Sequence, residues 1–208
     1  MQIQVKWIKP RQGRTKLNTD GAMFGDPRKA GGGGLLCNSE GDWIASFTRK
    51  LGSMYSIMAE LWALKEGLSL ARQLNLTNLN IEVDTVVLVH LLTNLGTINL
   101  MLESLLNDCM NLIKLFPNCS ITHIYREATR CVDKLAKMGA TQDTDLLILY
   151  EPLPVVDDLL VFDKAELFCN RLIVSSAFII IIIIIFFSCS AFLTKKKRKR
   201  QTILGKSQ

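Results

Sequence analysis

The chain has 208 residues and a formal net charge of +6, and this length suits one well-buried domain with a further segment rather than several domains. The basic excess alone does not indicate a nucleic-acid-binding domain, because the last 14 residues hold seven Lys or Arg and no acid, whereas residues 1–140 carry 16 Lys or Arg against 12 acids. The six cysteines contain no C-x-x-C pair and the N-terminus does not resemble a signal peptide, which argues against a disulfide framework and indicates a reducing compartment.

The predicted elements follow one another in an order typical of an α/β domain. A basic lead-in at 1–14 precedes a short strand at 15–20 and a hairpin at 31–52, and from Ser56 the apolar period changes to that of a helix at 56–75. The later elements are a strand at 79–84, helices at 85–96 and 100–116, a strand at 120–126 and a helix at 128–139. This order predicts a five-stranded mixed sheet flanked by helices over residues 15–140.

The character of the sequence changes after Ala140. Residues 141–171 form an acidic linker with seven acids against two basic residues, and residues 194–208 form a basic tail. Between them, residues 172–193 are 22 uncharged and mostly apolar residues, which predicts a transmembrane segment. We therefore expect a membrane location where this segment is expressed and a cytoplasmic or nuclear location otherwise. Homopolymeric isoleucine before a Lys/Arg block is also typical of translated low-complexity DNA.

The helix predicted at 56–75 carries an acid on its apolar side. At 100° per residue, Glu60 shares a face with Ala63 and Leu64, whereas Lys65 lies on the opposite face. An acid in the first turn is also favoured by the helix dipole alone. A carboxylate on an apolar face is costly unless it is paired or binds a metal, so we expect Glu60 to point inward for a functional reason.

Further acids stand at the ends of predicted strands. Asp20 ends the first strand and Asp84 ends "LNIEVD", although Asp84 before Thr85 is also a candidate helix cap. Asp133 lies on the last predicted helix. Together with Glu60, these residues make four carboxylates that a mixed sheet can bring to one spot.

Four consecutive glycines at 31–34 follow the first acid in the chain order. A tight turn needs only one or two glycines. The run therefore predicts a backbone that another group must approach closely.

Four stretches resemble the ribonuclease H-like domain found across plant genomes, in the reverse-transcriptase-like branch of the type-1 ribonuclease H family. They are "NTDGA" with the glycine run after it, "AELWALKEGL", "IEVD" and "HIYREATRCVDKLAKMG", and they cover roughly residues 15–140. The resemblance implies an α/β ribonuclease H-like fold, with Asp20, Glu60, Asp84 and Asp133 as the catalytic, metal-binding carboxylates.

The same resemblance implies hydrolysis of the RNA strand of an RNA–DNA hybrid with two Mg²⁺ ions, which Mn²⁺ can replace. Carboxylate oxygens are the hard ligands that Mg²⁺ prefers, and two ions can stabilise the attacking and leaving oxygens. Recognition is expected to use the 2′-hydroxyls and the backbone, with Gly21, Ala22 and Thr85 as candidate nucleic-acid contacts. The expected partners are the hybrid and a membrane through residues 172–193, and no obligate protein partner is inferred.

Two positions depart from the family pattern. Thr129 stands where the plant domains usually have Asn, and the catalytic-loop histidine of bacterial enzymes has no match. We interpret His123 as a structural residue because "SITHIYR" predicts a strand. Two other functions stay open, namely a catalytically inactive, retroelement-derived nucleic-acid-binding domain and a membrane-anchored interaction protein.

Overall fold

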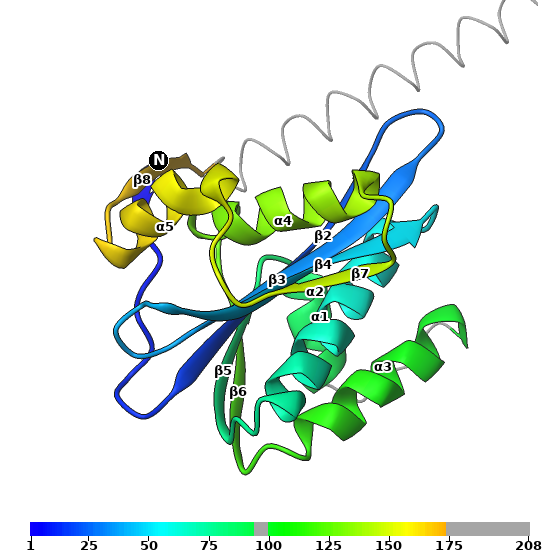
Figure 1. Cartoon of the computed structure of the whole chain (residues 1–208), viewed down its shortest axis with the longest axis horizontal. Coiled ribbons are helices and arrows are strands. Elements are labelled where there is room, and N and C mark those ends of the chain that lie inside the picture. The colour runs from blue at the N-terminus through cyan, green and yellow to red at the C-terminus, as the bar shows by residue number, and fades with distance from the viewer. Residues whose placement is uncertain (94–99, 174–208) are drawn as a thin grey trace, which may run out of the picture. The chain divides into compact units, whose positions relative to one another are not determined.

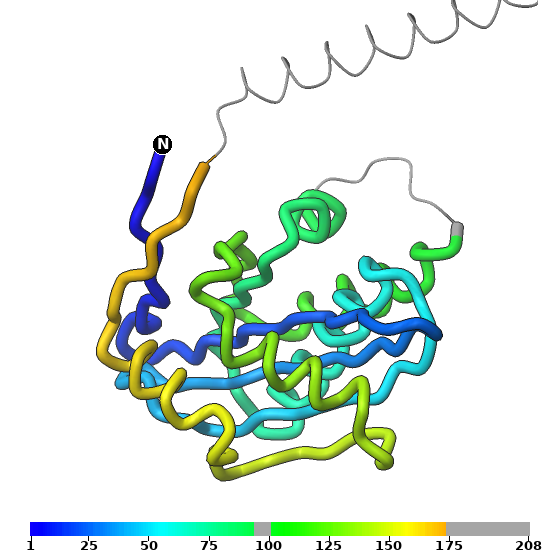
Figure 2. Tube along the Cα trace, turned by 90° about the horizontal axis from the view of Figure 1, so that it is seen from above, coloured from blue at the N-terminus to red at the C-terminus, as the bar shows by residue number. Residues whose placement is uncertain are grey.

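The computed structural model describes residues 1–93 and 100–173, which divide into two compact units. In the smaller unit, β1 (Gln2–Val5) pairs with β8 (Cys169–Leu172), and the amino group of Met1 donates to the carbonyl oxygen of Ile173 at 3.1 Å. Figure 2 shows these two strands alongside each other in blue and orange. The larger unit, Val5–Cys169, holds all of the candidate site residues.

The larger unit is a six-stranded sheet with helices on both faces (Figure 1). Its elements are β2 (Thr15–Phe24), β3 (Lys29–Cys37), β4 (Trp43–Gly52), α1 (Ser56–Gln73), β5 (Asn78–Val83), α2 (Val86–Thr93), α3 (Leu100–Ile113), β6 (Asn118–His123), η1 (Arg126–Ala128), α4 (Arg130–Thr141), β7 (Leu146–Leu149), η2 (Pro154–Val156) and α5 (Asp157–Lys164). The strand order is β6-β5-β2-β3-β4-β7, with β2, β3, β4 and β7 antiparallel in succession and β5 and β6 parallel to β2. The predicted mixed α/β architecture is confirmed.

The sixth strand corrects the prediction of a five-stranded sheet. β7 comes from the segment predicted as an acidic linker and pairs with β4, where Phe47 is the register partner of Ile148. The backbone N–H of Lys50 also donates to the carbonyl oxygen of Asp145 at 2.8 Å. The apolar run "LLIL" is only four residues long and is flanked by acids, so its pairing depends on the free edge that β4 offers.

The sheet and helix α1 enclose the main hydrophobic cluster. Leu17, Leu64 and Ile81 are fully buried there, and Leu106 joins them from α3. Helix α1 shows its expected orientation, since Glu60 is 1% exposed on the same side as these leucines. Burying this apolar surface is the main favourable contribution to the stability of the sheet and of the strands that carry the acids.

Helix α4 lies directly on the glycine run of β3. A Cβ on Gly33 would lie 2.4 Å from the backbone nitrogen of Ala136, and a Cβ on Gly31 would lie 2.2 Å from that of Ala140. Real Cβ atoms do not approach backbone atoms this closely, so a side chain here would push the helix away. Gly33 is also the register partner of Asp20. The predicted close approach is therefore made by α4, which carries Asp133.

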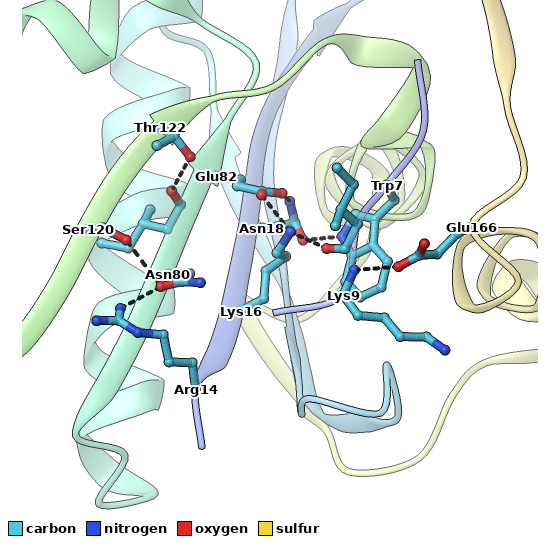
Figure 3. A network of polar contacts seen from close by, with 12 residues as sticks. Trp7, Lys9, Arg14, Lys16, Asn18, Asn80, Glu82, Ser120, Thr122 and Glu166 are labelled. Carbon is cyan, nitrogen blue, oxygen red and sulfur yellow. Dashed lines mark hydrogen bonds and ion pairs between the residues drawn. The ribbon is translucent and has the colours of Figure 1, made fainter. Parts of the chain in front are cut away.

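The lead-in at residues 5–10 packs onto β2 and β5 through a group of polar residues that we call the Lys16 cluster, namely Trp7, Lys16, Asn18 and Glu82 (Figure 3). Lys16 is 3% exposed, and its Nζ lies 2.5 Å from Glu82 Oε1, 4.8 Å from the centre of the Trp7 ring and in contact with the carbonyl oxygen of Ile8. Asn18 accepts from Trp7 Nε1 at 2.8 Å and donates to Glu82 Oε2 at 3.1 Å. The polar groups of this cluster pair with one another.

The predicted transmembrane segment at 172–193 lies outside the described residues except for its first two positions, and the basic tail at 194–208 lies wholly outside them. Leu172 is the last residue of strand β8. Among residues 1–93 and 100–173, none of the helices combines the length and the apolar character that a bilayer crossing requires.

Candidate metal centre

Three carboxylates from three elements meet at one end of β5, and we call them the carboxylate triad. Asp20 lies in the middle of β2, Asp84 directly follows β5, and Glu60 lies in the second turn of α1. β2 and β5 are parallel neighbours in which Thr19 opposes Val83, so each strand presents its acid at the next position. One carboxylate oxygen from each acid lies within 4.8 Å of the others. The structure thus brings three of the four predicted carboxylates together.

Helix α1 comes close enough to β2 to hold the Glu60 carboxylate against the strand. A Cβ on Gly21 would lie 2.4 Å from the backbone nitrogen of Glu60, so this position requires glycine. The Gly21 N–H donates to Glu60 Oε2 at 3.2 Å, and the Thr85 hydroxyl lies 3.1 Å from Glu60 Oε1. Both oxygens of this buried carboxyl group are thus held in place by the residues that follow Asp20 and Asp84.

Burial raises the pKa values of the two innermost acids. The pKa of Asp20 is raised to about 7, first by burial and then by the negative charges of Asp84 and Asp133. The pKa of Glu60 is raised to about 9 by burial, with the charges of Asp20 and Asp84 acting in the same direction. A nearby cation would favour the ionised forms and reverse these shifts.

The triad fits a divalent metal ion. Among the described residues, Asp20 Oδ1 is a buried oxygen without a hydrogen-bond partner. Buried polar atoms are nearly always paired, so an unpaired carboxylate oxygen beside two further carboxylates marks a position for a cation. Mg²⁺ and Mn²⁺ prefer such hard oxygen ligands. Asp20, Glu60 and Asp84 are therefore the residues that would hold the ion.

Asp133 lies outside the triad but faces the same hollow. It is in the first turn of α4, its side chain is 43% exposed, and its Oδ2 accepts from Lys137 Nζ at 2.6 Å. Its charge still reaches Asp20, because it contributes to the raised pKa of that acid. The sequence predicted four converging carboxylates, and the structure brings three together and places the fourth on the lining of the hollow.

Arg126 is a site residue that the sequence analysis missed. Its Nε donates to Asp84 Oδ2 at 2.6 Å, and this ion pair raises the pKa of the Arg126 guanidinium. The Asp84 side chain is 1% exposed and that of Arg126 is 74% exposed, so the pair reaches from the buried triad to the surface. Arg126 occurs in the stretch "HIYREATR", where no apolar period or spacing singles it out.

The hollow beside the triad has a volume of about 440 Å³. It is lined by Asp20, Gly21, Ala22, Met23, Phe24, Ser56, Arg126, Asp133 and Lys137. Two of the three predicted nucleic-acid contacts, Gly21 and Ala22, are therefore among the residues that line it. The third, Thr85, is placed among the carboxylates instead.

Thr129, which departs from the family pattern, and His123, which was interpreted as a structural residue, both have structural contacts. His123 is the last residue of β6, as the strand prediction required, and its Nε2 lies 3.1 Å from the carbonyl oxygen of Asp84. The hydroxyl of Thr129 donates to the carbonyl oxygen of Arg126 at 3.2 Å and so closes the η1 turn before α4. Both contacts hold segments that carry site residues.

A protein-family model described as reverse transcriptase-like matches residues 18–139. A relative from Arabidopsis thaliana named "Putative ribonuclease H protein" is 34% identical over 132 residues, which is 64% of this chain and 21% of that protein. The chain thus spans about a fifth of the length of this relative.

Solved structures of ribonuclease H proteins share the fold. Ribonuclease H1 of the archaeon Halobacterium salinarum has a TM-score of 0.57 at 26% identity and covers 61% of this chain and 96% of its own. An N-terminal ribonuclease H domain from Mycobacterium tuberculosis has a TM-score of 0.58 at 21% identity, covering 61% and 93%. The LC11 ribonuclease H1, solved with an RNA/DNA hybrid, has a TM-score of 0.56 at 20% identity, covering 61% and 96%. The predicted ribonuclease H-like fold is confirmed.

Proposed function

Because the chain belongs to the reverse-transcriptase-like family, we propose that it is an endoribonuclease that hydrolyses the RNA strand of RNA–DNA hybrids with two Mg²⁺ ions. The observation that carries the proposal is the carboxylate triad, in which Asp20 Oδ1 is buried and lacks a hydrogen-bond partner among the described residues. The LC11 ribonuclease H1, which shares the fold, was solved with an RNA/DNA hybrid, and this supports the same substrate.

Each carboxylate has a distinct task in this proposal. Asp20, Glu60 and Asp84 would hold one ion, and Asp20 and Asp133, which both line the hollow, would hold the second. Ions bound there supply a Lewis acid that activates water and stabilises the leaving oxygen. Asp133 must then exchange its contact with Lys137 for the ion, which its exposure permits.

The hollow beside the triad suits a phosphodiester backbone. Ala22 lines the hollow with a single methyl group and lies on the same face of β2 as Asp20, so no long side chain at this position fills the space beside that acid. Arg126 and Lys137 place two positive charges on its rim, where they would face phosphate oxygens. Such contacts recognise the shape and the charge of the duplex rather than its base sequence.

A hybrid-cleavage assay on the full-length protein tests the proposal. We expect a hybrid with end-labelled RNA to be cut in the RNA strand when Mg²⁺ is added, whereas duplex DNA stays intact. Asp20→Asn should remove cleavage, and Asp108→Asn, which changes an acid paired with Lys65 on the surface, is the matched control and should cleave at the wild-type rate. Wild-type activity in Asp20→Asn, or activity that persists in EDTA, contradicts the proposal.

The placement of Asp133 favours a second candidate function, nucleic-acid binding without turnover. Its ion pair with Lys137 keeps it outside the triad, and a centre that cannot recruit it lacks a ligand for the second ion. Fluorescence anisotropy with the same hybrid separates the two functions. Binding with no cleavage at any Mg²⁺ or Mn²⁺ concentration supports the binding function, and binding with metal-dependent cleavage supports the nuclease.

A further inference from the structure

We propose that Thr85 is a positioning residue whose hydroxyl holds Glu60 and Asp84 in the geometry that binds metal. This inference rests on the proposed metal-dependent function and gives Thr85 a role other than a nucleic-acid contact. Thr85 Oγ1 lies 3.1 Å from Glu60 Oε1 and 3.1 Å from Asp84 Oδ1. One hydroxyl thus joins two carboxylates that come from different elements, α1 and the end of β5.

The backbone of Thr85 is anchored at the start of α2. Its carbonyl oxygen accepts from the N–H of Leu88 at 3.0 Å and from that of Val89 at 3.3 Å. The hydroxyl of a threonine at such a position ordinarily accepts a hydrogen bond from a backbone N–H of the first turn and so caps the helix. The Thr85 hydroxyl lies at hydrogen-bonding distance from both carboxylates, and this position indicates a role in the metal centre.

The remaining oxygens of the two carboxyl groups have other partners. Glu60 Oε2 accepts from the N–H of Gly21 at 3.2 Å, and Asp84 Oδ2 accepts from Arg126 Nε at 2.6 Å. Glu60 is thereby held between β2 and Thr85, and Asp84 between Thr85 and Arg126. Because the Thr85 hydroxyl has a single hydrogen, it donates to one of these two oxygens at a time or shares the hydrogen between them. Its loss would remove the donor that lies between Glu60 and Asp84.

Groups that hydrogen-bond to metal ligands orient those ligands, and their removal typically costs about 10- to 100-fold in metal affinity. Thr85→Val keeps the shape of the side chain and removes the hydroxyl, whereas Thr85→Ser keeps the hydroxyl. Thr19→Val is a matched control, since Thr19 stands next to Asp20 as Thr85 stands next to Asp84. The Thr19 hydroxyl is buried and has no hydrogen-bond partner among the described residues.

The test is Mn²⁺ binding to the full-length protein without nucleic acid, measured by isothermal titration calorimetry. We expect Thr85→Val to weaken binding by about 10- to 100-fold, Thr85→Ser to restore it to within about threefold of wild type, and Thr19→Val to leave it unchanged. Thermal melting in EDTA checks that each variant is folded. Wild-type affinity in Thr85→Val, equal losses in Thr85→Val and Thr85→Ser, or an equal loss in Thr19→Val overturns the inference.

The hybrid-cleavage assay distinguishes failure of this inference from failure of the proposed function. Hydroxyl-dependent metal binding in a protein that does not cleave hybrids supports the role of Thr85 and contradicts the nuclease. Hybrid cleavage by the wild-type protein, together with equal Mn²⁺ affinities of wild type and Thr85→Val, supports the nuclease and contradicts the role of Thr85. A wild-type protein that binds no Mn²⁺ contradicts both.

Discussion

Two groups of buried polar side chains lie on the same pair of strands, and they differ in how their charges are compensated. In the Lys16 cluster, the ammonium group of Lys16 meets the carboxylate of Glu82, and Asn18 links that carboxylate to Trp7 (Figure 3). In the carboxylate triad, Arg126 forms an ion pair with Asp84, and the described residues place no cation in an ion pair with Asp20 or Glu60.

This difference in charge compensation distinguishes buried charges that stabilise the fold from buried charges that are available to bind a ligand. Lys16 and Asp20 are four residues apart on β2, and side chains at this spacing point to the same face of a strand. Both groups therefore use the same face of the same strand, so strand geometry does not explain why one group is paired and the other is not. Lys16 and Glu82 form an ion pair between β2 and β5, and Lys16 also contacts the carbonyl oxygen of Ile8 in the lead-in. In the triad, by contrast, Asp20 Oδ1 has no hydrogen-bond partner among the described residues.

The largest expected effect comes from removing the positive charge of Lys16 from the Lys16 cluster. Lys16→Met should lower the free energy of unfolding by about 3–5 kcal/mol, because it leaves the largely buried Glu82 carboxylate without its partner. Urea denaturation in EDTA measures the change. Lys65→Met is the matched control, because Lys65 pairs with the more exposed Asp108, and its cost should stay below about 1 kcal/mol. Equal losses of unfolding free energy in Lys16→Met and Lys65→Met would contradict the structural role of the buried ion pair.

The second effect is a dependence of stability on pH that comes from the triad. The pKa of Asp20 is raised from 3.8 to about 7 and that of Glu60 from 4.5 to about 9, so between these limits the folded protein keeps protons that the unfolded chain has released. Their contribution to stability is therefore complete at low pH and is lost as the pH rises toward about 9. In EDTA we expect the free energy of unfolding to fall continuously over this pH range.

Mg²⁺ should flatten that decline, because it stabilises the ionised carboxylates and binds only the folded centre. Denaturation at several pH values with EDTA and with MgCl₂ measures this difference, which should widen as the pH rises. Asp163, whose pKa is raised to about 6 by burial, lies apart from the triad, and its share of the decline should not respond to Mg²⁺. Parallel curves with and without Mg²⁺ would show that the triad binds no ion.

The third effect has the opposite sign to that of Lys16→Met. Asp20→Asn should raise the free energy of unfolding in EDTA at pH 8 by about 2 kcal/mol, because it removes a buried negative charge beside two others. The same variant should gain nothing from Mg²⁺. Asp42→Asn should instead lower stability slightly, since hydrogen bonds from Lys164 and Asn38 lower the pKa of this surface acid. Thermal melting of both variants measures whether Asp20→Asn raises stability and Asp42→Asn lowers it.

The smallest expected effect is the loss of one hydrogen bond in the Lys16 cluster. Trp7→Phe removes the indole N–H that Asn18 Oδ1 accepts at 2.8 Å and should cost about 1 kcal/mol in unfolding free energy. Because Asn18 lies outside the triad, the Mn²⁺ affinity should be the same as in wild type. A calorimetric titration that shows weaker binding in Trp7→Phe would mean that the two groups are coupled along β2.

Much of the candidate site could be predicted from local patterns. The helical period placed Glu60 on the buried side of α1, and the strand pattern placed Asp84 at the end of β5. The prediction that Asp20 ends its strand was wrong, because β2 continues to Phe24 as it pairs with β3. The glycine run correctly indicated a close approach of another element, which α4 makes. These predictions succeed because burial and strand pairing follow periods of a few residues.

The sequence by itself determined the order of the elements from β2 to α4, the ribonuclease H-like fold and the inward orientation of Glu60. Only the tertiary structure decided which charges are compensated, since Arg126 and Asp84 are 42 residues apart and Lys16 and Glu82 are 66 apart. It also decided that β7 joins the sheet and that Thr85 lies between two carboxylates. The physical reason is that a periodic pattern specifies the face a side chain occupies, whereas its partner depends on which distant element packs against that face.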